Sequence, residues 1–154
     1  MPGDGVVGSN CKAYYNSATH ASPTWVEITD AIDIGVDLSK VKADVSSRAG
    51  TWKHHKSGQK EGSISMSYLH NKGADTVFDA LLASYISDTP RQFAFMDGAI
   101  ATAANQGLRA YCEVFGMSQG QNLDDGVKYD FELGPTRFLE SSVIIQPTWF
   151  EVAL

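Results

Sequence analysis

Residues 40–60 are KVKADVSSRAGTWKHHKSGQK, and strand-like sequence lies on both sides of this stretch. The stretch contains six of the 12 Lys and Arg residues but only one of the 18 Asp and Glu residues, so its formal charge is +5 and that of the rest is −11. Such a cationic segment can contact nucleic acid or grip the acidic face of another copy of the chain. We call residues 40–60 the arm and predict that it makes contacts between subunits, through Lys40, Lys42, Arg48, Trp52, Lys53, His54, His55, Lys56 and Lys60.

The sequence on either side of the arm alternates with the period of a β-strand. Apolar and polar residues take turns over 32–39 and again over 63–68, which predicts two half-buried strands, the first with one buried face and one wet, acidic face. The apolar positions change phase between Leu38 and Val41, which predicts a bulge near Ser39 and Lys40. Together the two strands form a long hairpin whose basic end overhangs the domain.

The rest of the chain contains short strands, turns and one helix. Asp75 can cap a helix that runs to Ile86 and buries one apolar stripe on the sheet, namely Phe78, Leu81, Leu82 and Tyr85. Further strands are predicted over 11–16, 24–29, 91–96, 108–117 and 127–133, and an apolar segment over 143–154 should dock on the body. The fold class is therefore mainly β: a β-sandwich or barrel of about seven or eight strands with one flanking α-helix and a long protruding hairpin loop.

Length and composition limit the organisation of the chain. The 154 residues suit one domain, which we place at 11–154 behind a flexible lead-in at 1–10. Gly3, Gly5 and Gly8 match GxGxxG, but the strand before and the helix after that dinucleotide binding needs are both missing. The segment at the start of the sequence lacks the apolar core of a signal peptide, and no stretch resembles a membrane span. We expect the protein to be made and kept in cytosol-like conditions.

Charge and cysteine content exclude some function classes. A net charge of −6 argues against a general polyanion binder, although DNA can pass close to an acidic surface without being trapped. Cys11 and Cys112 do not form a disulfide framework or a zinc-site spacing, and we predict two reduced, buried thiols.

The sequence provides no assembled catalytic, cofactor or metal site. His54 and His55 are adjacent, so on a strand they would point to opposite faces, and a solvated loop pair is the better interpretation than a metal site. Residues 124–126 resemble a turn more than a calcium loop. Four acids could serve a glycosidase, but they occupy the wet faces of strands, which first indicates solvation: Asp33, Asp37, Asp130 and Glu132. We therefore predict a protein that is not an enzyme and has no cofactor.

Six landmarks follow one another in a distinctive order along the chain: Pro23–Ile28, Asp33–Trp52, Asp75–Ile86, Phe93–Gly98, Gly107–Val114 and Pro135-Thr136. The order of these landmarks resembles the tail tube proteins of long-tailed bacteriophages. The resemblance covers most of Cys11 to Thr136, and the end of the chain after Arg137 has no counterpart in it.

The resemblance implies a structural virion protein that is assembled in the host cytoplasm and forms hexameric rings stacked into a tube. In that family, strands from each subunit join in a continuous barrel around a lumen through which DNA leaves, and the long hairpin bridges to neighbours. The family also implies other tail proteins as partners, no specific DNA binding and no membrane. Asp33, Asp37, Asp130 and Glu132 become the candidates for residues that face the lumen.

Two other interpretations remain. A carbohydrate-binding or adhesion β-sandwich would have the same strand count and would use exposed aromatic residues such as Tyr14, Trp25 and Trp52. A tail-end or connector protein would share the tail tube fold. A binding module would be a stable monomer, whereas a tube protein would form rings or filaments without ligand.

Overall fold

The computed structural model describes residues 8–121, 123 and 126–153. The lead-in predicted for 1–10 lies largely outside these residues, and Gly8–Asn10 form a short 3-10 helix, η1. The other elements are β1 (Lys12–Asn16), β2 (Trp25–Glu27), β3 (Ala31–Asp44), β4 (His55–Leu69), α1 (Thr76–Ile86), β5 (Arg91–Met96), β6 (Gln106–Gly120), β7 (Lys128–Pro135), β8 (Phe138–Glu140), β9 (Val143–Ile145) and β10 (Thr148–Glu151). The mainly β class with one α-helix is confirmed. Neither helix in the described part is long and apolar enough to cross a membrane.

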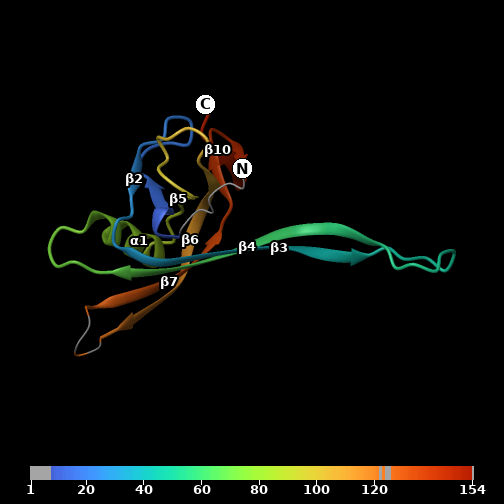
Figure 1. The fold of residues 1–154 in the computed structure, drawn as a ribbon, viewed down its shortest axis with the longest axis horizontal. Helices are drawn as coiled ribbons and strands as arrows, with labels where there is room; N and C mark the ends of the chain where they lie inside the picture. Colours follow the sequence, from blue (N-terminus) through green and yellow to red (C-terminus); the bar gives the residue numbers. More distant parts are fainter. Residues whose placement is uncertain (1–7, 122, 124–125, 154) are drawn as a thin grey trace, which may run out of the picture.

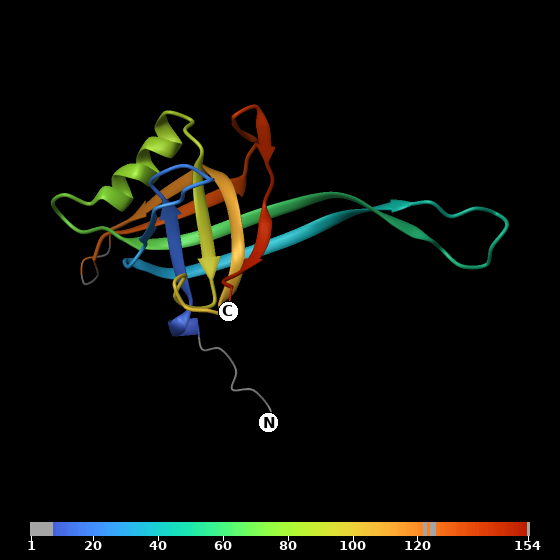
Figure 2. The ribbon, with the colours of Figure 1, turned by 90° about the horizontal axis from the view of Figure 1, so that it is seen from above.

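The long strand β6 divides the main sheet into two halves. The strand order is β2-β1-β5-β6-β7-β4-β3, with β10 added to β6. The first part of β6 pairs with β5 and β10, and residues 112–120 pair with β7. The strands of the two halves run in clearly different directions (Figures 1 and 2). We call β3, β4, β7 and residues 113–120 of β6 the four-strand half-sheet.

One core lies between the two halves of the sheet and α1. The core face of the four-strand half-sheet contributes Ile64, Met66 and Tyr68 from β4 and Phe131 and Leu133 from β7. The other half contributes Ala13, Tyr15, Phe93, Phe95, Leu108 and Ala110. The alternation predicted over 63–68 in β4 is therefore confirmed, and β7 follows the same pattern: apolar residues face this core and polar residues face away.

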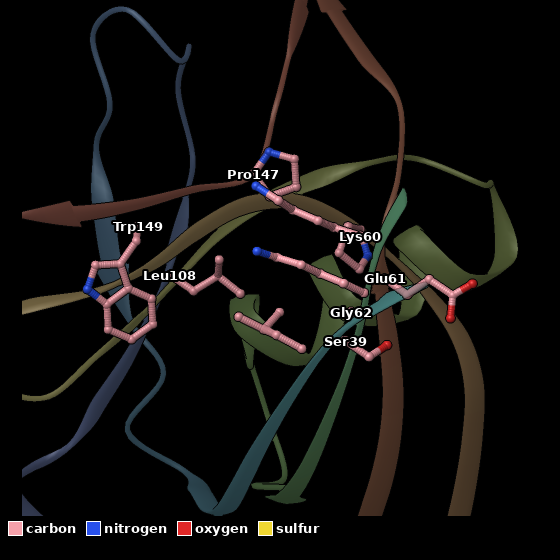
Figure 3. A pocket seen from close by; sticks show the side chains of 10 residues that line it. Ser39, Lys60, Glu61, Gly62, Leu108, Pro147 and Trp149 are labelled. Atoms are coloured by element: carbon pink, nitrogen blue, oxygen red, sulfur yellow. The ribbon is translucent and has the colours of Figure 1, made fainter. Parts of the chain in front are cut away.

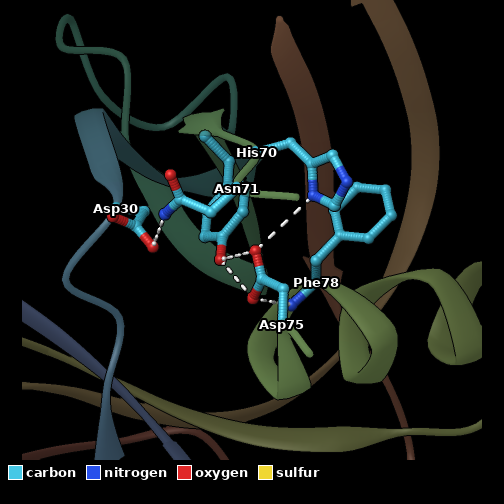
Figure 4. A network of polar contacts seen from close by, with 6 residues as sticks. Asp30, His70, Asn71, Asp75 and Phe78 are labelled. Carbon is cyan, nitrogen blue, oxygen red and sulfur yellow. Dashed lines mark hydrogen bonds and ion pairs between the residues drawn. The ribbon is translucent and has the colours of Figure 1, made fainter. Parts of the chain in front are cut away.

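Helix α1 begins where the sequence predicts. The carboxylate of Asp75 accepts a hydrogen bond from the backbone N–H of Phe78, which caps the first turn. Next to this cap, the side-chain amide of Asn71, in the loop after β4, donates a hydrogen bond to the carboxylate of Asp30, as Figure 4 shows. Phe78 and Leu81 are buried as predicted, and Leu82 is half-buried. The prediction for Tyr85 is wrong: its side chain is 43% exposed, and in the last turn of α1 it is Ser84 that is buried against β6 instead.

The arm is a two-stranded ribbon that projects far from the body (Figures 1 and 2). Pairing of β3 with β4 continues to Asp44 and His55, and residues 45–54 form the tip. The predicted irregularity exists, but it adds its extra residue to β4: Lys40 faces Lys60 and Lys42 faces Ser57, so two steps along β3 correspond to three along β4.

Two further predictions about burial are wrong. The large apolar residues of β3, from Ile32 to Val41, are exposed, because β3 is the edge strand of the sheet. Cys11 is exposed because it precedes β1, whereas Cys112 is buried in the middle of β6, and both thiols are free. The segment at 143–154 docks in part, through pairing of β10 with β6 and packing of Phe150 against the cluster of Tyr14, Ala94 and Met96.

Candidate assembly interface

The four-strand half-sheet has two edges without a partner strand. In the described part of the chain, β3 pairs only with β4, and residues 113–120 of β6 pair only with β7. All neighbouring strands are antiparallel, and their number is even, so the two edge strands run in opposite directions. An unpaired edge exposes backbone donors and acceptors to a strand of another chain.

One face of this half-sheet is polar, and its charged residues are mostly acids. The register aligns Asp33, Ser67, Asp130 and Ser118 in one row across all four strands. The next row consists of Gly35, Ser65, Glu132 and Gly116, and Asp37 faces Ser63 in the row beyond. The four predicted acids thus share one face, with one cation, Lys128, at the far end of β7.

Most residues in these two rows are short, since seven of the eight are Asp, Ser or Gly, and none of the eight is buried. Within these rows, the hydroxyl of Ser67 donates a hydrogen bond to Oδ1 of Asp130 at 2.6 Å. A shallow hollow of about 460 Å³ lies over it, lined by residues that include Ser63, Ser65 and Glu132. Because these side chains project little from the sheet, a large charged molecule can lie close to this face.

The opposite face of β3 carries an exposed apolar row. Ile34 faces Met66 and Val36 faces Ile64, so these pairs lie on the core face, and Leu38 faces Gly62. Met66 and Ile64 are at most 1% exposed, whereas Ile34 and Val36 are each 37% exposed and Leu38 is 56% exposed. We call Ile34, Val36 and Leu38 the β3 row. An exposed apolar stripe of this kind is typical of an interaction surface.

The structure places the predicted arm residues in two groups. Lys40, Lys42, Lys60, Lys56 and His55 lie on the paired part of the ribbon. Arg48, Trp52, Lys53 and His54 lie in the tip, where Trp52 is 79% exposed. Lys40 and Lys60 are directly opposite each other, an arrangement of like charges that is unfavourable without an anionic partner.

Among the described residues, the arm has no such anionic partner. The ion pairs between described residues are Lys12 with Glu27 and His70 with Asp75, and neither involves the arm. Within the tip, Val45 donates from its backbone N–H to the carbonyl of His54, and His54 donates to Oγ of Ser46. The tip therefore has local hydrogen bonds but no apolar cover.

A pocket of about 770 Å³ opens where the arm joins the body. Its apolar lining comes from Leu38, Leu108, Pro135, Pro147 and Trp149, and Lys40 and Lys60 lie at its rim. Figure 3 shows that Lys60 and Glu61 point in opposite directions, so that the lysine faces the pocket and the carboxylate does not. The pocket combines an apolar lining with positive charge.

The sequence did not indicate a second polar cluster on the other half of the sheet. Nε2 of Gln92 lies 2.7 Å from Nδ1 of His20, Arg109 donates to the carbonyl of His20 at 2.7 Å, and the N–H of His20 donates to Glu140 at 2.9 Å. Burial, with the nearby Arg109 cation, lowers the pKa of His20. This cluster ties the loop after β1 to β8, and no periodic pattern could have revealed residues so far apart in the chain.

The aromatic residues do not form a common platform. Tyr14 is buried in the body, Trp25 is half-buried with the guanidinium of Arg109 5.2 Å from its ring centre, and Trp52 lies at the distant arm tip. The expectation that Tyr14 is exposed is wrong, because β1 lies between β2 and β5. These three aromatic residues therefore do not support a carbohydrate-binding site.

The ionisable groups do not form a reactive arrangement in the described residues. Three or more His, Cys, Asp or Glu side chains do not gather there as a metal site would require. Burial raises the pKa of the Cys112 thiol to about 12, so this cysteine stays protonated and unreactive. Residues 124 and 125 of the predicted turn lie outside the described part.

Comparison with known proteins gives a clear result for the fold. No family model matches the sequence, and no curated protein matches it. The structure is similar to the SPP1 tail tube, with a TM-score of 0.74 at 11% identity over 97% of this chain and 81% of that one. The tail of an empty gene transfer agent (GTA) particle, refined with C6 symmetry, gives 0.67 at 13% identity over 84% and 93%.

A third similar structure comes from the six-fold symmetrised baseplate of the anti-feeding prophage (AFP). It has a TM-score of 0.59 at 9% identity and covers 100% of both chains. These identities are low, so the comparisons establish architecture. The chain has the fold of the tail tube proteins.

Proposed function

We propose that this chain is the structural protein of a tail tube, in which copies join into hexameric rings and the rings stack into a hollow tube that conducts DNA out of the virion. The observation that carries the proposal is the pair of free edges on the four-strand half-sheet. Monomeric β proteins usually cover or interrupt free sheet edges, because these pair with strands of other chains, whereas the described part of this chain has two edges without a partner strand.

The directions of the edges suit a closed ring. Because β3 and β6 run in opposite directions, β3 of one copy can join β6 of the next in antiparallel fashion. The same step can repeat around a ring, and every edge is then paired. The contact uses two different surfaces on each subunit, as a head-to-tail ring requires. The C6 symmetry of the GTA tail supports six subunits.

The acidic face of the half-sheet is assigned to the lumen. DNA phosphates bind to Lys and Arg surfaces in a salt-dependent way, and a face bearing Asp33, Asp37, Asp130 and Glu132 repels them instead. The lumen is then a conduit for DNA without being a binding site. The face opposite to it carries α1 and the core, which would form the outer layer of the tube.

The arm is assigned to contacts with neighbouring subunits. It has a charge of +5, whereas the rest of the chain has −11, and Lys40 and Lys60 have no anionic partner among the described residues. Trp52 would provide apolar contact area on the neighbour, and the cations around it would fix the register.

A second candidate is a tail-end or connector protein. It is favoured by the similarity to the AFP baseplate structure over the full length of both chains. A protein at the end of a tail would form one ring and would not continue to polymerise, because one of its two ring faces contacts a different protein.

Negative-stain electron microscopy of the purified protein tests the proposal. We expect hollow tubes with a regular axial repeat, formed without any ligand. Single rings that never stack would favour the tail-end candidate. A monomer at every concentration, with a thermal midpoint that rises when an oligosaccharide is added, would favour a binding module and contradict the proposal.

A further inference from the structure

We infer that the C-terminal end of α1 in one subunit covers the β3 row of the next subunit. The inference rests on the proposed ring and specifies which surfaces close it. The proposed partner is a second copy of this chain, and the contact joins an exposed helix end on one copy to an exposed strand face on the other.

The first step is the position of α1 relative to the free edge of β6. Oγ of Ser84 accepts a hydrogen bond from the backbone N–H of Val114 at 3.4 Å, and both residues are buried. Val114 lies just beyond Cys112, the last β6 residue that pairs with β5. The final turn of α1 therefore lies beside β6 at the point where its free edge begins.

The second step concerns the face on which α1 lies. Phe78 and Leu81 of α1 belong to the same core as Ile64 and Met66 of β4. The β3 row lies on that same face, because Ile34 and Val36 are directly opposite Met66 and Ile64. A β3 strand added to the β6 edge of a neighbour would therefore bring its apolar row to the side that carries the neighbour's α1.

The third step is that both surfaces lack cover within one chain. Tyr85 is 43% exposed and Ile86 is 68% exposed, although both are large and apolar. The β3 row is exposed to a similar degree, while Met66 and Ile64, the β4 partners of Ile34 and Val36, are fully buried. Pairing of the edges would place these two surfaces together, and burying both in one contact removes apolar area from water on each side.

A second copy fits this surface better than a different partner. The contact is continuous with the strand pairing of the proposed ring, so the same association would cover both surfaces. The β3 row also lies at the base of the arm, because Leu38 comes two residues before Lys40 on the same strand. No additional protein is needed to bury either surface.

Disulfide cross-linking tests the inference. In a Cys11→Ser background, which leaves only the buried Cys112, Val36→Cys and Ile86→Cys are made in the same chain and the assembled protein is oxidised under mild conditions. We expect a ladder of covalent oligomers up to the hexamer on a non-reducing gel, and its disappearance on reduction. The matched control pairs Val36→Cys with Asp79→Cys, an exposed position in the first turn of α1, and should give no ladder.

The two single variants protect the test against a folding failure of the double variant. An equal mixture of Val36→Cys and Ile86→Cys chains should give covalent dimers, and either variant alone should not. Tubes or rings that form normally but give neither ladder nor mixed dimer would overturn the inference and leave the proposed function intact. Failure of the Cys11→Ser parent and of the unmodified protein to assemble at all would overturn both.

Discussion

The hydroxyl of Tyr68 donates to the carboxylate of Asp75 and lies 2.7 Å from Oδ1 and 2.8 Å from Oδ2. The same carboxylate caps α1 through the N–H of Phe78, and it lies 3.5 Å from Nδ1 of His70 (Figure 4). One acid thus joins the end of β4 to the start of α1. Because α1 covers the core and flanks the β6 edge, this link also fixes part of the proposed interface.

Replacing Asp75 should destabilise the isolated domain. Asp75→Ala removes the cap and leaves the Tyr68 hydroxyl without its acceptor, so we expect a loss of about 1 to 2 kcal/mol in the free energy of unfolding. Urea denaturation followed by circular dichroism measures it. Asp79→Ala, in the same turn but exposed, serves as the control and should change stability by less than about 0.5 kcal/mol. Equal effects of the two changes would argue against the capping role.

The same acid should make stability depend on pH. Burial opposes ionisation of Asp75, but hydrogen bonds from Tyr68 and from the backbone outweigh it, so its pKa lies below the ordinary value. A lowered pKa means that the folded state binds its proton less readily than the unfolded state does. The stabilisation is thus complete above the unfolded pKa of about 4 and is lost as pH falls through the folded pKa.

Tyr68→Phe provides the control for this pH dependence. It removes one of the donors that lower the pKa of Asp75, so the decline of stability in acid should become shallower. Unfolding curves between pH 7 and about pH 2 would report both slopes, because the ordinary carboxyl range lies within that interval. Identical slopes for the two proteins would show that this hydrogen bond does not set the pKa.

Two positions on α1 should separate folding from assembly. Leu81 is fully buried, so Leu81→Ala should cost about 2 to 5 kcal/mol and lower the yield of folded protein. Tyr85 is exposed in one chain, so Tyr85→Ala should change the thermal midpoint little but weaken assembly. Calorimetry and sedimentation velocity measure the two effects. A large loss of stability in Tyr85→Ala would contradict the exposure of that side chain.

The lumen assignment can be tested by size-selective labelling. In the Cys11→Ser background, Asp130→Cys should react with a small maleimide in both free subunits and assembled tubes. A maleimide carried on a large polyethylene glycol should label the free subunits but not the lumen of tubes. Asp79→Cys, on α1 and so on the opposite side of the half-sheet, should react with both reagents in both states. Equal labelling of Asp130→Cys by the large reagent in tubes would place the acidic face outside.

The arm should be needed for assembly and dispensable for folding. Lys42 and Ser57 face each other in register, so residues 43–56 can be replaced by an Asn-Gly turn that closes the shortened hairpin. We expect a native circular dichroism spectrum and no tubes by sedimentation or microscopy. Trp52→Ala should likewise leave stability unchanged, because the indole is exposed, and should reduce assembly. Normal tubes from the shortened chain would mean that the arm does not hold subunits together.

The sequence by itself determined those features that depend on local spacing. The alternation of Ile64, Met66 and Tyr68 with serines predicted which face of β4 is buried, and Asp75 predicted the start of α1. The bounds of β5 were also correct, because a compact apolar run between Pro90 and a turn leaves little choice. The separation of charge between arm and body was visible in the distribution of charged residues along the sequence.

Only the tertiary structure decided which apolar residues are covered. Ile34 and Met66 are both apolar residues in the same alternating pattern, and they lie side by side, but only Met66 is buried. The difference comes from strand order, since β3 is an edge strand and β4 lies between two neighbours. Tyr85 likewise follows the helical spacing of the buried Phe78 and Leu81, but it is 43% exposed. Periodicity reports which side of an element is apolar, and the position of that element in the fold determines whether anything lies against it.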